Sequence, residues 1–483
     1  MKLKTLIEQL DIVALNADPE TEIGGISYDS RKTEEGDLFV AIRGFETDGH
    51  RFIPKAVERK AAVILCENPP EQNVPWLQVG DSRLALARCS AAYYGNPASR
   101  MRMIGITGTS GKTSVSTLLK HVLEEAGHAK VGLIGTTGIL IGGEEIPSEY
   151  TTPESLELHR LFQRMAEEGC THAVMEVSSH ALELKRVAGI EFDTAVFTNL
   201  SQDHLDFHGT MERYAGAKKK IFDQCRAAWV NADDAWTAFM TDGVRCPVRG
   251  FGIREGAALC AENIRKYPNR VCFEAVHGGE RAETELQIPG LFSVYNALAV
   301  LAAALSEGIP LAESAKALSS AHGVKGRLES VPTGGNYHIL IDYSHKPDAL
   351  EKVLRSLRES TPGKLICLFG CGGDRDRLKR PLMGKIAAEN ADYVIVTSDN
   401  PRTEDPEAII DEIVPGLAGT KTPWVRICDR VEAIRRAMDL AGEGDVILLA
   451  GKGHETYQIV GHTKRHMDER EIVADYLRER EKE

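Results

Sequence analysis

A chain of 483 residues is longer than one hydrophobic core usually supports, so its length predicts about two to four domains. Hydrophobic residues make up 42% of the chain and charged residues 27%, as in an ordinary globular protein. The net charge of −13 argues against a general binder of nucleic acid or of acidic membranes, although a local basic pocket for a phosphorylated substrate is compatible with it.

The ten cysteines are scattered along the chain, several of them within apolar stretches, and no CxxC pair is present. The sequence therefore indicates neither a zinc site nor a disulfide framework. Reduced, mostly structural thiols are typical of a cytoplasmic protein, and the cytoplasm is the location that we expect.

The first segment mixes short β-like runs with turns. Its start, MKLKTLIEQLDIVAL, carries two lysines, but acidic residues interrupt the apolar part and no small-residue cleavage site follows, so we expect no signal peptide. Strands are predicted within DLFVAIRG (37–44) and AAVILC (61–66), and YYGNPASR (93–100) is predicted to be a linker.

The second segment opens with the buried-strand pattern MRMIGI (101–106), followed by a glycine-bearing loop and an amphipathic helix. Further strands are predicted at 172–177 and 194–200. The longest apolar run, ALAVLAAAL (297–305), is far too short to span a membrane and predicts a buried helix.

The third segment follows a second predicted linker, HGVKGRLESVPTGG (322–335), and alternates apolar runs with stretches of helical spacing. Alternation of this kind predicts βαβ units and a parallel sheet, and we expect three α/β domains in all. The predicted strands of this last segment are HILIDY (338–343), KLICLFG (364–370), YVIVTSD (393–399) and DVILLAG (445–451).

The stretch GITGTSGKTS (105–114) lies between a predicted strand and a predicted helix. It resembles the phosphate-binding P-loop, although Ile106 stands at the first glycine position of the usual pattern. Its glycines let backbone N–H groups approach phosphate oxygens at a helix N-terminus. Lys112 is then placed to neutralise phosphate charge and the Thr113 hydroxyl to reach Mg²⁺, which predicts an ATP site. A chance glycine-rich turn is the alternative.

A second glycine-rich loop, GCGGDRD (370–376), also follows a predicted strand. It carries Arg375 where a dinucleotide-binding fingerprint has its third glycine. The loop therefore gives little support to a redox enzyme.

Four apolar residues define one stripe of a predicted helix at about 100° per residue: Met211, Tyr214, Ile221 and Phe222. Lys218 falls at the centre of this stripe, whereas the two lysines that follow it fall well off it. Because an unpaired buried ammonium is unfavourable, we expect Lys218 to lower its pKa, to pair with a carboxylate, or to be carbamylated by CO₂ into an anion that binds or orients a metal.

Two candidate metal ligands follow predicted strands. Glu176 lies near the end of the buried run HAVMEV, and His204 follows Asp203 after the run TAVFTNL. If these side chains lie near Lys218 they form a metal site, and a simple buried ion pair is the alternative.

The loop TSDNPRTEDP (397–406) follows the predicted strand YVIVTSD. In one interpretation it is a strand-to-helix connection in which Pro401 is a turn residue and Thr403 or Asp405 caps the helix. In the other it is a binding loop, because ligands of doubly wound sheets lie at the carboxyl ends of the strands.

A series of motifs in this sequence resembles the Mur ligases of peptidoglycan synthesis, and in particular their diaminopimelate-adding branch. The similarity spans essentially the whole chain, and the motifs occur in the family's order. They are YDSRKTEEGDLFVAIRG (28–44), GTSGKT (108–113), TTP (151–153), EVSSHAL (176–182), DHLDFHGTME (203–212), YNALA (295–299), KGRLE (325–329), DYSHKPDAL (342–350), FGCGGDRDRLKRPLMG (369–384), DNPR (399–402) and GKGHE (451–455).

The resemblance implies a uridine-nucleotide-binding N-terminal domain (1–98), a central P-loop-type ATPase domain (99–330) and a C-terminal Rossmann-like domain that binds the amino acid (331–483). It also implies an ATP-dependent ligase that activates the UDP-linked muramoyl dipeptide as an acyl phosphate and adds meso-diaminopimelate to it. Mg²⁺ is the implied cofactor, and the partners are the three small-molecule substrates. We expect no nucleic acid, no membrane span and a monomeric chain.

The residues that match the family's motifs fall into four implied groups. ATP is held by Thr107, Gly108, Thr109, Ser110, Gly111, Lys112, Thr113, Asn296, Arg327 and Asp342. The UDP-linked dipeptide is held by Ser30 at its uridine end and by Thr151, Thr152, Ser178 and Arg186 at its muramoyl-dipeptide end. Diaminopimelate is held by Arg375, Asp399, Asn400, Pro401, Arg402, Gly451 and Glu455. The residues implied to bind the metal or to act in catalysis are Lys112, Thr113, Glu176, His204 and a carbamylated Lys218.

The chain departs from the family's pattern at two positions. Leu184 stands where some members carry a polar substrate contact, and Ser293 stands where an Asn is frequent. The first departure puts one sugar or peptide contact in doubt.

Other functions compatible with parts of the sequence are the L-lysine-adding counterpart, a folylpolyglutamate synthetase, a P-loop kinase or NTPase, and a nucleotide-binding module without catalysis. DNPR, GKGHE and YDSR argue against the folylpolyglutamate synthetase. Turnover of ATP without an amino acid would favour the kinase or NTPase.

Overall fold

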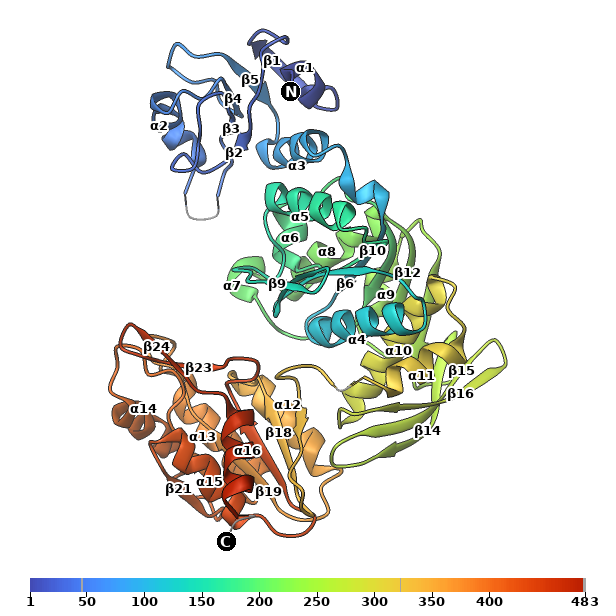
Figure 1. Ribbon diagram of the computed structural model, residues 1–483, viewed down its shortest axis with the longest axis vertical. Helices are drawn as coiled ribbons and strands as arrows, with labels where there is room; N and C mark the ends of the chain where they lie inside the picture. The colour runs from blue at the N-terminus through green and yellow to red at the C-terminus, as the bar shows by residue number, and fades with distance from the viewer. Residues whose placement is uncertain (45–46, 322, 481–483) are drawn as a thin grey trace. The chain divides into compact units, whose positions relative to one another are not determined.

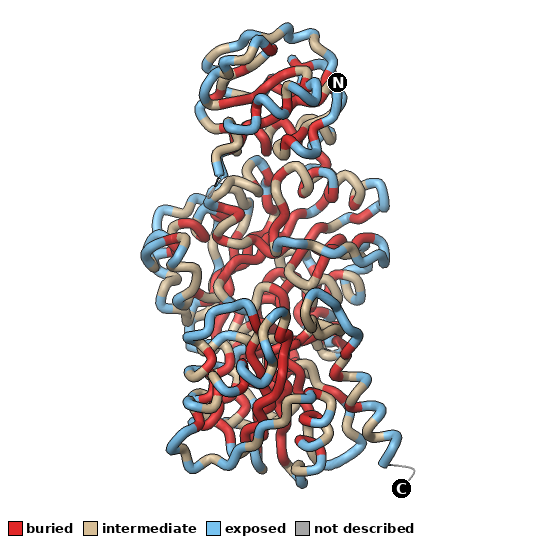
Figure 2. Tube along the Cα trace, turned by 90° about the vertical axis from the view of Figure 1, so that its left-hand side faces the viewer, coloured by how far each residue is buried: buried red, intermediate tan, exposed pale blue. Residues whose placement is uncertain are grey.

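The structure is a computed structural model that describes residues 1–44, 47–321 and 323–480. The chain divides into two compact units, one comprising Met1–Phe251 with Ala302–Ile309, the other Gly252–Leu301 with the chain from Pro310 onward. In both units the buried residues lie toward the interior and the exposed residues toward the outside (Figure 2).

The first unit begins with a five-stranded sheet of order β1-β5-β4-β3-β2, in which only β1 is antiparallel to its neighbour. The predicted strands within 37–44 and 61–66 are confirmed as β3 and β4, and the predicted linker contains a 3₁₀ turn, η2. The elements are α1 (Leu3–Ile7), β1 (Ile12–Asn16), β2 (Ile26–Ser27), β3 (Leu38–Val40), η1 (Gly49–Phe52), α2 (Ile53–Glu58), β4 (Val63–Cys66), β5 (Trp76–Val79), α3 (Ser82–Tyr93) and η2 (Pro97–Arg100).

The rest of the first unit is built on a larger sheet in which β13-β12-β11-β6-β10-β7 run parallel and β8 and β9 are added antiparallel. Its elements are β6 (Arg102–Thr107), α4 (Lys112–Glu125), β7 (Val131–Gly135), β8 (Gly138–Ile141), β9 (Glu144–Ile146), α5 (Ser155–Glu167), β10 (His172–Glu176), α6 (Ser179–Glu183), β11 (Phe192–Phe197), α7 (Leu205–His208), α8 (Met211–Lys219), η3 (Lys220–Gln224), β12 (Cys225–Asn231), α9 (Thr237–Thr241) and β13 (Val248–Gly252).

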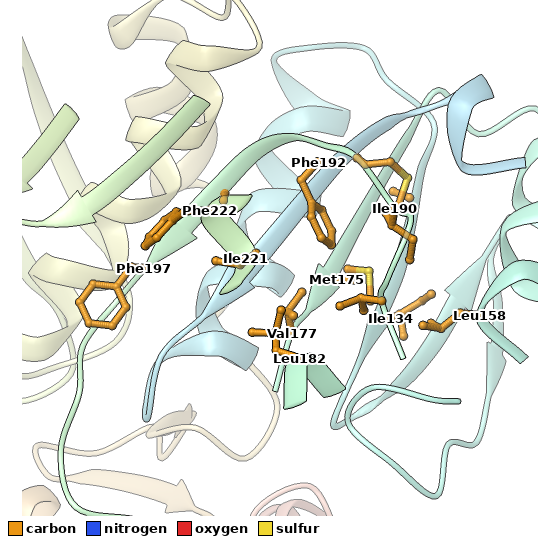
Figure 3. Packing of buried hydrophobic residues seen from close by; sticks show 14 of the residues in the cluster. Ile134, Leu158, Met175, Val177, Leu182, Ile190, Phe192, Phe197, Ile221 and Phe222 are labelled. Carbon is orange, nitrogen blue, oxygen red and sulfur yellow. The ribbon is translucent and has the colours of Figure 1, made fainter. Parts of the chain in front are cut away.

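Apolar side chains from the strands and from α5, α6 and η3 form the core of this part (Figure 3). Met175 and Phe192 come from two strands of the sheet, Leu158 from α5 and Ile221 from η3. The core fixes the strands, so the loops at their carboxyl ends project from a rigid frame.

The second unit contains the antiparallel strands β14 (Leu259–Lys266), β15 (Val271–His277) and β16 (Glu280–Leu286), with α11 (Leu311–Ser319) packed on β16. The predicted buried helix at 297–305 is confirmed, because α10 spans Leu291–Ser306 and its residues 297–304 are fully buried.

The last domain has a sheet of order β17-β18-β22-β19-β20-β21, parallel except for β17, which confirms the four predicted strands and their parallel arrangement. Its elements are β17 (Glu329–Val331), β18 (His338–Asp342), α12 (Pro347–Arg358), β19 (Leu365–Phe369), α13 (Lys379–Asn390), β20 (Tyr393–Val396), α14 (Pro406–Ile413), η4 (Val414–Leu417), β21 (Trp424–Arg426), α15 (Arg430–Leu440), β22 (Val446–Ala450), β23 (Tyr457–Val460), β24 (Thr463–His466) and α16 (Glu469–Arg480).

One prediction is wrong in part. The stretch 322–335 was predicted to be a linker, but it contains β17, which pairs antiparallel with β18 and buries Val331. The flanking Gly and Pro residues are typical of a loop, so they favoured a linker over a strand. The three-residue strand β17 is stabilised by pairing with β18 rather than by its local sequence. Residue 322 lies outside the described residues.

No helix of the described chain is long and apolar enough to cross a membrane.

Candidate functional site

The phosphate loop connects β6 to α4, as the sequence predicts (Figure 1). Gly108 and Gly111 both have positive φ, at 150° and 87°, and a Cβ on Gly108 would collide with Oγ1 of Thr198. Glycine is therefore required at both positions for the loop to close onto the start of α4. Lys112 folds back over the loop, and its Nζ donates hydrogen bonds to the carbonyl oxygens of Gly108 (2.9 Å) and Thr109 (3.0 Å).

The segment that follows β11 holds this loop from the other side. Ser110 donates its backbone N–H to Oδ1 of Asn199 (3.0 Å), and its carbonyl oxygen accepts from Oγ1 of Thr198 (2.7 Å) and Nδ2 of Asn199 (3.0 Å). Sequence reasoning missed the role of Thr198 and Asn199. The only available signal was their place at the end of the strand predicted at 194–200.

Helix α8 presents two side chains to the phosphate loop. Tyr214 Oη lies 3.1 Å from Oγ1 of Thr109, and Lys218 Nζ lies 4.7 Å from the centre of the Tyr214 ring. Lys218 is only 1% exposed, which confirms its predicted place on the buried stripe.

Lys218 donates a 2.7 Å hydrogen bond to the Gly108 carbonyl oxygen, the same atom that accepts from Lys112. Within the described chain it forms no salt bridge, which leaves a lowered pKa or carbamylation as the open alternatives. Burial, reinforced by the positive charge of Lys112, holds the pKa of the Lys218 amine well below its ordinary value.

Glu176 is buried at the end of β10 and accepts two hydrogen bonds from Thr136, one from its backbone N–H (2.8 Å) and one from its hydroxyl (3.1 Å). His204 has positive φ, a half-exposed side chain, and an edge-on contact with His180 at 4.8 Å between ring centres. In the described residues no three His, Cys, Asp or Glu side chains come together as a metal site, so protein ligands of these types alone do not complete one.

The predicted dipeptide-binding residues are brought together beside Glu176. Thr152 Oγ1 donates to the Glu176 carbonyl oxygen (2.8 Å) and accepts from the backbone N–H of Ser178 (3.1 Å). Arg186 donates to the Thr152 carbonyl oxygen (3.0 Å), and Thr151 Oγ1 lies 3.0 Å from Oγ1 of Thr136. Ser30 lies in the N-terminal sheet region, apart from this cluster.

A cavity of about 570 Å³ in the first unit is lined by Leu184, which was noted above as a departure from the family's pattern. Three of its lining residues are basic: Arg43, Arg213 and Lys220. Two of these charges are already paired, Arg43 with Glu67 (3.1 Å) and Lys220 with Glu183 (2.5 Å), which also lines the cavity. Sequence reasoning did not identify this cavity.

The remaining predicted nucleotide contacts lie in the second unit. Asp342 is buried and accepts from the backbone N–H groups of Leu328 and Ser344, both at 2.9 Å, and desolvation raises its pKa. The Arg327 guanidinium lies over the Tyr343 ring at 5.3 Å, and Asn296 is buried on α10. Since the phosphate loop belongs to the first unit, these three contacts with ATP stay a prediction.

The predicted amino-acid site lies in the loops that follow β19, β20 and β22. Asp399, Asn400, Pro401 and Gly451 are buried there. Asn400 Nδ2 donates to Oε2 of Glu455 (2.8 Å). Arg375 also lies in these loops, but its side chain is exposed.

Arg402 is anchored by its backbone. It has a φ of 52°, its N–H donates to Ile459 of β23 (3.0 Å), and its carbonyl oxygen accepts from Gly461 (2.7 Å). One guanidinium N–H donates to the Gly373 carbonyl oxygen (2.8 Å). This bond fixes the orientation of the Arg402 guanidinium, and its other N–H groups can donate to a ligand. Asp405 caps α14 by accepting from the backbone N–H of Glu407, which confirms one of the two predicted caps.

Lys452 is a site residue that sequence reasoning missed. It is fully buried, and its Nζ donates to Oδ1 of Asn400 (2.9 Å) and to Oε2 of Glu455 (2.8 Å). These bonds fix the orientation of the Asn400 amide and the Glu455 carboxylate. Its position inside GKGHE was the only signal.

Comparison with known families gives three matches along the chain. Residues 22–94 match the Mur ligase family catalytic domain, residues 106–304 the Mur ligase middle domain, and residues 326–453 the Mur ligase glutamate ligase domain.

The chain is 46% identical over 471 residues to the UDP-N-acetylmuramoyl-L-alanyl-D-glutamate–2,6-diaminopimelate ligase of Caldanaerobacter subterraneus subsp. tengcongensis, covering 97% of both chains. It is 44% identical to the ligase of the same description from Geobacillus thermodenitrificans, covering 99% of this chain and 100% of that one.

A solved structure with this same description is 31% identical and has a TM-score of 0.76, covering 100% of this chain and 99% of that one. The folylpolyglutamate synthase of Mycobacterium tuberculosis has a TM-score of 0.60 at 18% identity, covering 76% of this chain and 92% of that one, so it shares the fold.

Proposed function

Because this chain belongs to the Mur ligase family, we propose that it is the ATP-dependent ligase that joins meso-diaminopimelate to UDP-N-acetylmuramoyl-L-alanyl-D-glutamate. The observation that carries the ligase chemistry is the buried Lys218 amine, which meets the phosphate loop at the carbonyl oxygen of Gly108. A protein that only bound ATP would have no use for a buried amine at this point.

The reaction proceeds in two steps. The terminal carboxylate of the dipeptide attacks the γ-phosphorus of ATP, so that an acyl phosphate forms and ADP leaves. The neutral amine of the amino acid then attacks the acyl carbon, inorganic phosphate leaves from the tetrahedral intermediate, and one proton is released. The backbone N–H groups of the phosphate loop and the Lys112 ammonium stabilise the charge on the transferred phosphoryl group.

Lys218 acts in this scheme as a carbamate. Only a neutral amine attacks CO₂, and burial lowers the pKa of Lys218, which raises the fraction of its neutral form. The product is a carbamate anion and a proton, and the neighbouring Lys112 ammonium, which shares the Gly108 carbonyl oxygen, is suited to stabilise the new negative charge.

A carbamate would also complete a set of donors for Mg²⁺. The Glu176 carboxylate and the Thr113 hydroxyl would supply the hard oxygen ligands that this ion prefers, and His204 would be the nitrogen ligand. When bound, Mg²⁺ would lower the charge repulsion between the substrate carboxylate and the γ-phosphate. The residues present therefore fit the cofactor.

Arg402 provides the specificity for diaminopimelate. This amino acid differs from lysine by a second carboxylate at its far end, and a planar guanidinium pairs with a carboxylate through two parallel hydrogen bonds. Lysine would leave Arg402 desolvated and unmatched, and sites built around such a pair reject the analogue without it by about 10⁴-fold or more.

The test is phosphate release by the full-length protein with ATP, Mg²⁺ and UDP-N-acetylmuramoyl-L-Ala-D-Glu, with either meso-diaminopimelate or L-lysine added. We expect release with diaminopimelate and very little with lysine. Release with lysine alone, or equally with both, would keep the ligase but reject the Arg402 clamp. Release that does not depend on an amino acid would favour a kinase or NTPase.

We also propose that the enzyme works in the cytoplasm as a monomer. The scattered cysteines, which form no disulfide in the described chain, support the first part, and size-exclusion chromatography with light scattering tests the second.

A further inference from the structure

A cavity of about 740 Å³ lies at the end of the central sheet opposite the phosphate loop. Arg102, Glu191 and Arg226 line it, and each lies within one residue of the start of its strand, β6, β11 or β12. These strands are parallel, so their starts lie at one edge of the sheet and their carboxyl ends at the other. The phosphate loop follows the carboxyl end of β6, and the length of β6 puts it about 17 Å from the cavity. The cavity is therefore separate from the ATP site, and all of its lining residues belong to the first unit.

One wall of this cavity contributes a buried polar group without a partner. His159 on α5 is 1% exposed, and within the described chain neither of its ring nitrogens has a hydrogen-bond partner. Burial lowers its pKa to about 4, so the ring is neutral near pH 7 and offers one N–H donor and one acceptor. Buried polar groups are normally satisfied, so an orphaned imidazole on a cavity wall indicates a missing hydrogen-bonding partner.

Two of the three arginines that line the cavity are held in ion pairs. Arg102 pairs with Asp193 (3.1 Å) and with Glu307 (2.7 Å), and Arg226 pairs with Glu191 (2.7 Å) and with Asp193 (3.2 Å). Arg100 donates only to a backbone carbonyl oxygen of its own turn, and the described chain gives it no ion pair. The exposed Arg100 guanidinium is thus the lining cation that an anion could pair with, beside arginines that are already paired.

We propose that this cavity binds a small organic anion, a carboxylate or a phosphate monoester with an apolar body. Arg100 binds the anionic group, His159 satisfies a neutral polar group of the ligand, and the apolar body lies against Ala98, Met101 and Cys170. The volume falls within the range of about 300–1,000 Å³ that is usual for small-molecule sites.

The experiment uses isothermal titration of the full-length protein with phenyl phosphate, with 3-phenylpropionate and with the neutral 3-phenylpropanol. The protein carries Lys112→Ala, which removes the lysine of the phosphate loop, so that binding reports on the second site. We expect at least one anionic probe to bind, and to bind about tenfold more tightly than the alcohol.

Three variants in this background locate the site. Arg100→Gln should weaken the anionic probe about tenfold without affecting the alcohol, because it removes the charge partner alone. His159→Leu should also weaken the probe. Arg160→Gln is the matched control, since Arg160 is exposed on the same helix as His159 and does not line the cavity; it should leave binding unchanged.

Binding of phenyl phosphate alone or of 3-phenylpropionate alone supports the site and identifies the ligand class. The proposal is overturned if neither anionic probe binds at millimolar concentration, if Arg100→Gln and His159→Leu both leave binding unchanged, or if Arg160→Gln weakens it as much as Arg100→Gln does.

Discussion

Lys218 shows how one side chain can be both unfavourable to the fold and useful to the chemistry. A buried ammonium without a carboxylate is destabilising. Burial therefore disfavours the charged form and lowers the pKa of the amine. The neutral amine that results is a nucleophile toward CO₂. The same burial that opposes the charged lysine therefore favours its carbamylation.

Replacing Lys218 by Ala is expected to abolish ligase activity and to remove the carbamate. With ¹³CO₂ dissolved in the buffer, the wild-type protein should show a carbamate carbonyl signal by ¹³C NMR, and Lys218→Ala should not. Lys219→Ala is the control, since Lys219 is the next residue and is only half-buried. A signal that survives in Lys218→Ala, or that is missing from the wild type, would contradict the carbamate.

Arg402 is expected to determine which amino acid is added. Arg402→Lys keeps the positive charge but loses the planar fork, so kcat/KM for meso-diaminopimelate should fall about 100-fold while the weak reaction with lysine changes little. The measurement is phosphate release at several concentrations of each amino acid. Arg465→Lys, on exposed β24, should behave as wild type. An unchanged preference in Arg402→Lys would mean that another residue selects the substrate.

Lys452 is expected to position its neighbours rather than to bind ATP. Lys452→Met leaves Asn400 and Glu455 without their shared donor, so KM for diaminopimelate should rise about tenfold or more while KM for ATP stays the same. Lys464→Met is a matched control, because both lysines lie over the Tyr457 ring but Lys464 is exposed. An equal rise of KM for both substrates would indicate general loss of the domain's structure instead.

The phosphate loop depends on how closely β6 and the segment after β11 approach each other. Gly108 has no room for a side chain because Thr198 fills the space, and the Ser110 backbone is held by three hydrogen bonds to Thr198 and Asn199. The loop is thus preorganised by the segment that follows β11, so ATP binding should cost little conformational entropy in the loop.

Gly108→Ala is expected to destabilise the protein in two ways, through the positive φ and through the clash of the new Cβ with Thr198. The clash should lower the free energy of unfolding by about 1–3 kcal/mol in addition to the cost of the positive φ, and the variant should no longer bind ADP. Gly169→Ala is the control, because Gly169 also has positive φ but nothing within 4 Å of the added Cβ. Thermal unfolding and ADP titration of both variants separate the two effects. Equal destabilisation in the two variants would show that the clash with Thr198 is relieved by a small shift.

At the scale of the molecule, the ten cysteines all lie in the part of the chain that the structure describes, and they form no disulfide there. Most are buried, and burial raises the pKa of the thiols, for example to about 11 for Cys66 and to about 12 for Cys367. Such thiols react slowly, because the thiolate is the reactive form.

We therefore expect Ellman's reagent to titrate all ten thiols in denaturant, and dithiothreitol to leave the melting temperature unchanged. Fewer than ten thiols in unreduced protein would point to Cys225 and Cys246, whose sulfur atoms lie 3.4 Å apart.

The features that could be predicted from the sequence are those with a local cause. The strands of the C-terminal sheet follow from apolar runs between helical stretches, and the phosphate loop follows from glycines before Lys112. The burial of Lys218 follows from the helical period alone, because every neighbour on its stripe is apolar. These properties depend on residues a few positions apart, so a single sequence contains them.

Only the tertiary structure decided the features that join distant residues. Thr136 meets Glu176 across 40 positions, and Lys452 meets Asn400 across 52. The strand β17 exists because β18 pairs with it, and the cavity beside His159 exists because the starts of β6, β10, β11 and β12 converge there. No local pattern marks these pairings, since each depends on the order in which the strands join the sheet and on which side chains that order brings within hydrogen-bond reach.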